Sequence, residues 1–241
     1  MMTASLAGDY DLIALDTVIG SYDYDTDPLL QTYFRPIEHA LWMLIERYGE
    51  GVNDIGWQIA DHLRRTSLDG MKFLTEALGF SARAGKNFHA ANLFQDLGKI
   101  HGSFAPTLWD LPHRPTDEER RMKITHTEKG VELLNIALRE APESLKSHPH
   151  VAIVIPAIQL FHHERVDGSG PFHKKGADIG QVIKSICIID AKDGDMIQRG
   201  HQPERRNEKE TLIRMKTGEK YQGAFDDMLD TYIHYRERIS I

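Results

Sequence analysis

The sequence VAIVIPAIQLFHHERVDGSG (residues 151–170) joins an apolar run to two adjacent histidines, a carboxylate and a glycine-rich turn. An apolar run of this length predicts an element that is buried on all sides. Imidazoles at its end would lie at the mouth of the core, where paired histidines serve as metal ligands. We therefore expect a functional site at His162 and His163.

The chain has 241 residues, of which 41% are hydrophobic and 27% charged, and its formal net charge is −7. This composition is ordinary for a globular protein with one sizeable core. The negative charge argues against nonspecific binding to DNA or to an anionic membrane, although a local basic pocket can oppose it. The single cysteine, Cys187, cannot form an intrachain disulfide. Because the sequence has no secretory leader and no apolar run of membrane-spanning length, we expect a soluble, cytoplasmic protein.

The spacing of apolar residues predicts helices over most of the chain. From Pro28 to about residue 49, apolar residues return at intervals of three and four, which indicates an amphipathic helix. Thr116 and Glu119 form a capping-box pattern, so a helix is expected to begin there and run to about Glu140. Further helices are predicted at about residues 53–78, 86–95, 150–163, 178–198, 206–216 and 222–238. Strand-like alternation is scarce and residues 22–27 are typical of a polar loop, so the predicted fold class is all-α.

Several histidines and aspartates lie near the ends or inward faces of different predicted helices. They are His62, Asp96, His126, His162, His163 and Asp190. A metal site inside a helical bundle requires such separated ligands, because each helix contributes only one or two side chains to a common centre. Histidine and aspartate bind iron, manganese or zinc, and a carboxylate can bridge two ions. The chain has 13 histidines, and some are interpreted as surface or internally hydrogen-bonded residues: His39, His89, His101 and His234.

Five segments together resemble the HD-GYP subgroup of the HD-domain phosphohydrolases. They are QDLGKI (95–100), RMKITHTEKG (121–130), FHHERVDGSG (161–170), IIDAKDGDM (188–196) and GEKYQGAFDDML (218–229). The resemblance covers about residues 53–235 and implies an all-helical HD-domain bundle with a metal centre that hydrolyses cyclic di-GMP by metal-activated water. We therefore expect an N-terminal extension, consisting of a loop and an amphipathic helix, at residues 1–52 and an HD-GYP-like domain at residues 53–241.

The matching motifs imply two metal positions that share Asp96 as a bridge. The first would consist of His62, Asp96 and Asp190, and the second of His126, His162 and His163. Asp96 and Lys99 would be the catalytic residues, with Lys99 facing a ligand phosphate; the alternative for Lys99 is a solvated residue after a helix. Other phosphate contacts are expected from Lys174, Lys175 and Arg199. One or two divalent transition-metal ions are expected, with iron or manganese favoured over zinc.

Three residues depart from the family pattern. Gln95 replaces the metal-binding histidine of the HD doublet, and its amide oxygen is a weak neutral ligand for such ions. Gln58 lies four residues before His62, where members with three ions have a glutamate. Pro171 follows Gly170 directly, without the tyrosine of the GYP signature. The centre is therefore expected to hold one or two ions and not three.

The turn after the histidine pair has a structural interpretation. Asp167 is expected to order it through backbone hydrogen bonds, while Gly168 and Gly170 supply conformations that other residues resist. Glu164 and Arg165 are either partners of the histidines or an ion pair at the helix end.

Two classes of function remain open. The first is an active phosphodiesterase in which Gln95, or a water that it holds, replaces the missing histidine. The second is a degenerate domain without turnover, which binds a metal, a nucleotide or a signalling protein as a sensor or interaction module. Metal content measured together with turnover separates the two.

Overall fold

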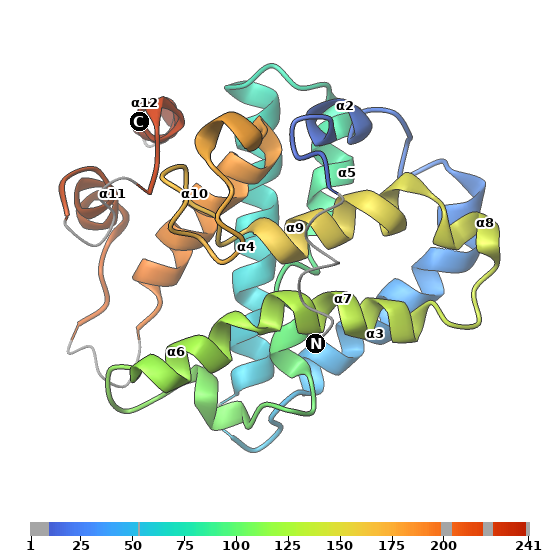
Figure 1. The fold of residues 1–241 in the computed structure, drawn as a ribbon, viewed down its shortest axis with the longest axis horizontal. Coiled ribbons are helices and arrows are strands. Elements are labelled where there is room, and N and C mark those ends of the chain that lie inside the picture. Colours follow the sequence, from blue (N-terminus) through green and yellow to red (C-terminus); the bar gives the residue numbers. More distant parts are fainter. Residues whose placement is uncertain (1–9, 53, 199–203, 219–223, 240–241) are drawn as a thin grey trace.

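The computed structural model describes residues 10–52, 54–198, 204–218 and 224–239, and the regular elements in these ranges are helices without a β-strand (Figure 1). The main helices are α3 (Arg35–Arg47), α4 (Ile55–Glu76), α5 (Ala82–Asn92), α6 (Asp117–Ile124), α7 (His126–Ala137), α9 (Ile155–Phe161), α10 (Gln181–Met196), α11 (Glu208–Thr217) and α12 (Asp227–Ile239). Short helical turns join them: α2 (Leu15–Val18), η1 (Leu30–Phe34), η2 (Leu97–Ile100), η3 (Pro106–Trp109), α8 (Glu143–Lys146), η4 (His150–Val154) and η5 (Gly176–Asp178). The predicted all-α class is confirmed. Within the described ranges, no helix combines the length and the apolar character needed to cross a membrane.

The capping box predicted at the start of α6 is present. The hydroxyl of Thr116 accepts from the backbone amide of Glu119 at 3.2 Å, and the Glu119 carboxylate accepts from the Thr116 amide at 2.7 Å. The single helix predicted from there to about Glu140 is wrong, because the chain breaks at Thr125 into α6 and α7. The charged helix α6 buries no residue, whereas α7 packs against η2 and α9. Thr125 thus separates the exposed, charged helix α6 from His126, which is buried at the start of α7.

The apolar run before the histidine pair is buried from Val154 onward, whereas Ile153 is exposed, so the prediction of burial on all sides is wrong for the start of the run. Every residue of α9 is buried. The π-helical turn η4 runs directly into α9, and Pro156, which has no backbone N–H to donate, lies at the junction of the two. Helix α9 runs beside α7 across the middle of the molecule (Figure 1) and also contacts α5 and α10. The 22-residue helix α4 packs against α3, α5 and α10. These helices surround the position at which the predicted ligands meet.

The segment before α3 contributes to the core. Tyr22 and Tyr24 are buried, so the prediction of a polar loop is wrong for these two side chains. The amide of Asn87 in α5 satisfies the backbone there, because it donates to the carbonyls of Ile19 and Tyr22 at 2.7 and 2.8 Å. The hydroxyl of Tyr22 also lies 2.8 Å from Nδ1 of the buried His150. These long-range contacts, which no local pattern signals, fix the segment on the helical bundle.

The side chain of Asp16 caps α10 from across the fold. Its carboxylate oxygens accept hydrogen bonds from the backbone amides of Gln181 and Val182, at 2.8 and 2.9 Å. An anion at this end of a helix satisfies amides that have no partner within the helix and interacts favourably with its dipole. Because α10 carries Asp190, the N-terminal segment helps to position a candidate ligand. The domain boundary expected after residue 52 stays a prediction.

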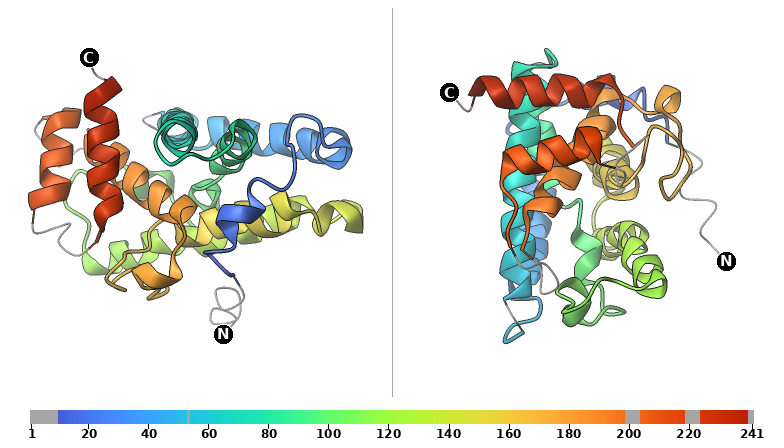
Figure 2. Two further views of the ribbon diagram at one scale, coloured as in Figure 1. Left: turned by 90° about the horizontal axis from the view of Figure 1, so that it is seen from above. Right: turned by 90° about the vertical axis from the view of Figure 1, so that its left-hand side faces the viewer.

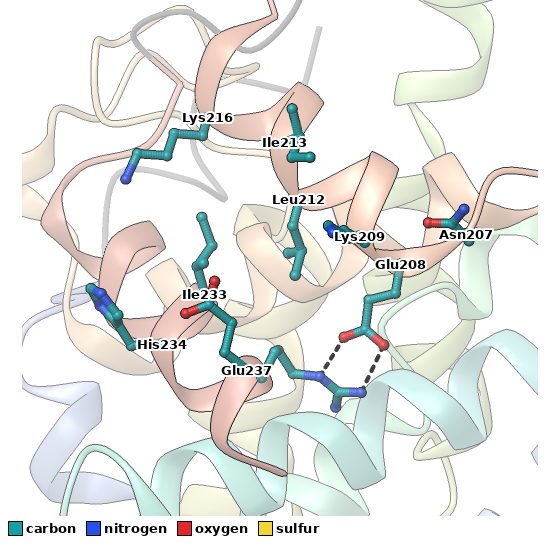
Figure 3. Close-up of a pocket in the computed structure, with 10 residues that line it drawn as sticks. Asn207, Glu208, Lys209, Leu212, Ile213, Lys216, Ile233, His234 and Glu237 are labelled. Carbon is teal, nitrogen blue, oxygen red and sulfur yellow. Dashed lines mark hydrogen bonds and ion pairs between the residues drawn. The ribbon is translucent and has the colours of Figure 1, made fainter. Parts of the chain in front are cut away.

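Helices α11 and α12 pack on the bundle through their own apolar cluster (Figure 2). The cluster comprises Phe73, Ile188, Ile189, Leu212, Met215, Leu229, Tyr232 and Tyr235. Asp69 of α4 anchors α12, since it accepts from the Tyr232 hydroxyl at 2.5 Å and from Arg236 at 2.9 Å. A cavity of about 820 Å³ lies between α11 and α12 (Figure 3), and none of the predicted site residues lines it.

Candidate metal centre

The six predicted ligands come from separate parts of the sequence and meet in one place. His62 lies in α4, Asp96 follows α5, His126 begins α7, His162 and His163 follow α9, and Asp190 lies in α10. They form two groups, one of His126, His162 and His163 and one of His62, Asp96 and Asp190. Within each group the candidate ligand atoms lie within 4.8 Å of one another. The grouping coincides with the two expected sets, whereas metal binding itself stays a prediction.

A close approach of two backbones brings Asp96 to His126. The turn η2, which follows Asp96, lies directly on the start of α7. A Cβ atom at Gly98 would overlap the carbonyl oxygen of His126 and would lie 2.5 Å from the backbone nitrogen of Gly130. Only glycine therefore fits at position 98, and the contact sets the distance between the two candidate ligands.

Asp96 lies between the two groups and is completely buried. Its Oδ1 atom is 3.0 Å from Nε2 of His126 and 3.5 Å from Nε2 of His162. Its Oδ2 atom is 3.2 Å from Nε2 of His62. The two oxygens thus face different groups, as a bridging carboxylate requires. Burial alone would raise the pKa of Asp96, but the Lys99 ammonium, 2.5 Å from Oδ2, holds this pKa well below its usual range.

The imidazoles of His126 and His162 each have one favoured tautomer when they are neutral. Nδ1 of His126 donates to the Lys123 carbonyl at 2.6 Å, and Nδ1 of His162 donates to the Gln159 carbonyl at 2.9 Å. Each Nε2 then carries a lone pair, and these two atoms lie 3.1 Å apart. Beside them, Oδ1 of Asp96 accepts no hydrogen bond from any described residue. Three converging acceptors without a donor repel one another, so this position fits a cation.

Burial keeps two of the imidazoles in the neutral form that metals bind. It lowers the pKa of His126 and of His163, and the neighbouring His162 lowers the pKa of His163 further. Nδ1 of His163 lies 3.5 Å from Oδ2 of Asp190, and its ring centroid is 4.1 Å from that of His162. The side chain of His163 is 30% exposed, so it borders the side from which solvent reaches the centre.

A carboxylate that the sequence analysis did not assign orients His62. Oδ2 of Asp193 accepts from Nδ1 of His62 at 2.7 Å, and Arg65 holds the same carboxylate with two hydrogen bonds of 2.8 and 2.9 Å. A carboxylate behind a metal-binding histidine fixes its tautomer and its orientation. A signal was present in the sequence, because Asp193 follows Asp190 by three residues and such residues share a helix face.

The amide of Gln95 occupies the His62 half of the centre. Its Nε2 atom is 3.2 Å from Nε2 of His62 and 3.3 Å from Oδ1 of Asp190, while its buried Oε1 has no hydrogen-bond partner among the described residues. Burial lowers the pKa of His62, but Asp190 and Asp193 outweigh this effect and hold the pKa well above 6.5. When His62 is charged, its Nε2 atom carries a proton. A 180° rotation of the Gln95 amide would then place the Oε1 atom of Gln95 next to this N–H group. This half of the centre is therefore hydrogen-bonded without an ion.

Among the predicted phosphate contacts that the structure describes, Lys99 lies at the centre. Lys99 pairs with Asp96 and lies against the ring of Trp109, 5.6 Å from its centroid, so it is not a freely solvated residue. Lys174 and Lys175 lie in the loop between α9 and η5. No hydrogen bond or ion pair joins their ammonium groups to the six candidate ligands in the described part of the chain. Arg199 lies outside the described residues.

Glu164 closes the loop that follows the histidine pair. Its buried carboxylate accepts from the backbone amides of Phe172 and Lys174, at 2.7 and 2.8 Å. A Cβ atom at Gly170 would lie 2.6 Å from the Cα atom of Glu164, so the loop requires glycine there. Both roles expected for Glu164 are wrong, because the carboxylate binds backbone amides rather than a histidine or Arg165.

The arrangement defines an all-helical, HD-domain-like bundle. Among solved structures, this chain is similar to Bd1817, a HDG"Y"P protein from Bdellovibrio bacteriovorus. The match has a TM-score of 0.57 and 12% sequence identity, and it covers 96% of this chain and 74% of that chain. No protein-family model and no curated protein sequence matches this chain. At this identity the likeness shows the fold, and the chemistry has to be argued from the site.

Proposed function

We propose that this chain is a divergent, metal-dependent phosphodiesterase of the HD-GYP type that hydrolyses cyclic di-GMP. The observation that carries the proposal is the convergence of Asp96 Oδ1 with the Nε2 atoms of His126 and His162, without a donor among the described residues. The similarity of the fold to a HDG"Y"P protein supports an HD-GYP type of fold, and the proposed reaction rests on the site.

The metal would be held mainly on the histidine-rich side. Its ligands there would be Asp96, His126, His162 and His163. A set of three imidazoles and one carboxylate suits iron, manganese or zinc, and we propose iron or manganese. A second ion among His62, Asp96 and Asp190 would be weakly held, because Gln95 offers a neutral amide where a histidine would bind better.

In this proposal a bound divalent ion supplies Lewis-acid chemistry, which makes water more acidic and withdraws charge from a phosphate. Lys99 would move its ammonium group from Asp96 to the phosphoryl oxygens, where it neutralises negative charge that develops during hydrolysis. The carboxylate of Asp193 would keep His62 in one orientation during the reaction. Phosphate contacts from Lys174, Lys175 and Arg199 stay predictions.

The second candidate function is a binding domain without turnover. Its support is the Gln95 amide, which connects His62 and Asp190 by hydrogen bonds in the half of the centre where a second ion would lie. Such a domain would bind cyclic di-GMP, or a signalling protein, and would act as a sensor.

A product assay beside calorimetric titration distinguishes the two functions. We expect protein loaded with iron or manganese to convert cyclic di-GMP to the linear dinucleotide or GMP. His162→Ala or His163→Ala should abolish product formation, whereas His234→Ala, at an exposed position of α12, should not. Binding without product supports the sensor. Neither binding nor product would mean that this chain does not use the ligand of the HD-GYP proteins.

A further inference from the structure

Trp109 borders the metal centre without being one of its candidate ligands. It is the last residue of η3, and it is half-buried. Its ring meets the imidazole of His126 edge-on, with 5.9 Å between the centroids and 82° between the planes. It also meets the buried ring of Phe104, at 5.4 Å and 74°. These aromatic contacts fix the orientation of the indole beside a candidate ligand.

The indole N–H group of Trp109 binds the turn that carries Lys99. Nε1 of Trp109 donates to the backbone carbonyl of Lys99 at 3.0 Å. Lys99 lies in η2, a short turn that directly follows Asp96. An indole has one donor and no acceptor, so this hydrogen bond has only one possible direction. The bond ties the backbone of Lys99 to a side chain that comes 10 residues later in the chain.

The same ring lies close to the ammonium group of Lys99. Nζ of Lys99 is 5.6 Å from the ring centroid, a distance at which a cation is attracted to an aromatic face. Nζ of Lys123 lies 5.9 Å from the same centroid. Lys123 also contributes the backbone carbonyl that accepts from Nδ1 of His126. One indole thus contacts two cations and a candidate metal ligand.

The side chain of Lys99 has two partners at the centre, the indole and the carboxylate of Asp96. Nζ donates to Oδ2 of Asp96 at 2.5 Å, and the lysine side chain is 21% exposed. Lysine has a flexible four-carbon stem, which loses conformational entropy when its ammonium group is fixed. Because one indole contacts both the backbone and the ammonium group of Lys99, part of this freedom is already lost before a phosphate binds.

We propose that Trp109 is a positioning residue that acts through Lys99. The indole holds η2 in place through its N–H group and holds the ammonium group at the edge of the centre through its ring. Its role in hydrolysis rests on the proposed function, in which Lys99 moves from Asp96 to the phosphoryl oxygens. The attraction of a cation to a ring is less directional than a hydrogen bond, so the ammonium group can make this move while it stays beside the indole.

Tryptophan emission tests the contact without turnover. The chain has three tryptophans, and Trp42→Phe combined with Trp57→Phe leaves Trp109 as the only one. A positive charge beside an indole changes the wavelength of its emission, so Lys99→Met in this metal-free background should shift the emission of Trp109. Lys209→Met, at an exposed position of α11, is the control. Equal emission spectra of the two folded lysine variants would overturn the proposal.

The turnover of Trp109→Phe tests the role in hydrolysis. Phenylalanine keeps an aromatic ring and lacks the N–H donor. In protein loaded with iron or manganese, we expect the kcat for cyclic di-GMP to fall by about tenfold, the loss of one hydrogen bond, while the metal content and KM stay close to those of wild type. Trp57→Phe, at an exposed position of α4, should keep the wild-type kcat.

A double-mutant cycle shows whether Trp109 acts through Lys99. In the Lys99→Met background, Trp109→Phe should have little further effect on the hydrolysis that remains. An equally large fall in that background, or loss of metal from Trp109→Phe, would overturn the positioning role. A wild type that forms no product would contradict the proposed function instead, and the emission spectra would still decide whether the indole holds Lys99.

Discussion

The Nε2 atom of His126 lies 3.1 Å from the Nε2 atom of His162, and both atoms present lone pairs when the imidazoles are neutral. The carboxylate of Asp96 adds an anionic oxygen 3.0 Å from His126. In a buried site, such an arrangement costs free energy unless a proton or a metal ion lies among the acceptors. The predictions on metal binding below depend on this contact.

We expect the purified protein to retain at least one transition-metal ion after mild dialysis, with the second position weak or empty. Metal analysis of the dialysed protein is the measurement. His162→Ala should lose the ion because it removes a central ligand, and His234→Ala should retain it. Less than about a tenth of an ion per chain, with no uptake of added iron, manganese or zinc, would contradict the prediction.

Gln95→His should increase occupancy of the second metal position and raise the rate of cyclic di-GMP hydrolysis. Neutral imidazole is a better ligand for these ions than an amide, and the side chain already lies 3.2 Å from His62. The metal count and the turnover of wild type and variant are compared after identical loading. An unchanged count and rate in a folded variant would place the defect in the altered GYP loop instead.

Asp193→Asn should lower the pKa of His62 in the metal-free protein. Burial opposes the charged imidazole, so the pKa of His62 depends on the surrounding carboxylates, and this change removes one that lies 2.7 Å away. NMR titration of the imidazole measures the effect. Asp61→Asn, on the exposed face of the same helix, is the control. Equal titration curves for the two variants would show that Asp193 does not act on His62.

Acid should destabilise the protein through His150, which is fully buried. Burial, assisted by His148 and Arg35, lowers the pKa of His150 from 6.5 to about 3. The unfolded chain therefore takes up a proton below about pH 6.5 that the folded chain does not accept. Stability is full above that pH and falls as the pH drops toward 3, by up to about 1.4 kcal/mol per pH unit.

Urea unfolding of wild type and His150→Gln between about pH 7 and pH 5 checks this prediction. Glutamine does not titrate and can still pair with the Tyr22 hydroxyl, which lies 2.8 Å from His150. The variant should lose less stability on acidification than wild type. Parallel pH dependences would assign the acid sensitivity to other groups.

Most helices could be predicted from local patterns in the sequence. The cap formed by Thr116 and Glu119 is a contact between residues three apart. The turn at Asp167 is equally local, since its carboxylate accepts from the Ser169 amide at 2.9 Å and Gly168 has a φ of +82°. The apolar run of α9 is buried because it has no polar face. Such features depend on neighbours along the chain and can therefore be predicted.

Features that depend on contacts between residues far apart in the sequence were not predicted. The break at Thr125 lies where α7 begins to pack on η2, and the buried Tyr22 contacts His150 and Asn87. The position of Asp193 behind His62 joins residues separated by 131 positions. Periodicity reports which face of a helix is apolar, but it does not report which other helix lies against that face.

Because Asp16 caps α10, removal of the N-terminal segment would affect the helix that carries Asp190. A shortened chain of residues 53–241 would leave the amides of Gln181 and Val182 without this acceptor. It would also expose the apolar surface that Leu12 and Leu15 cover. The segment before residue 53 and the helix that carries Asp190 are therefore expected to melt in one cooperative transition, and metal ligation at Asp190 would be sensitive to truncation far from it.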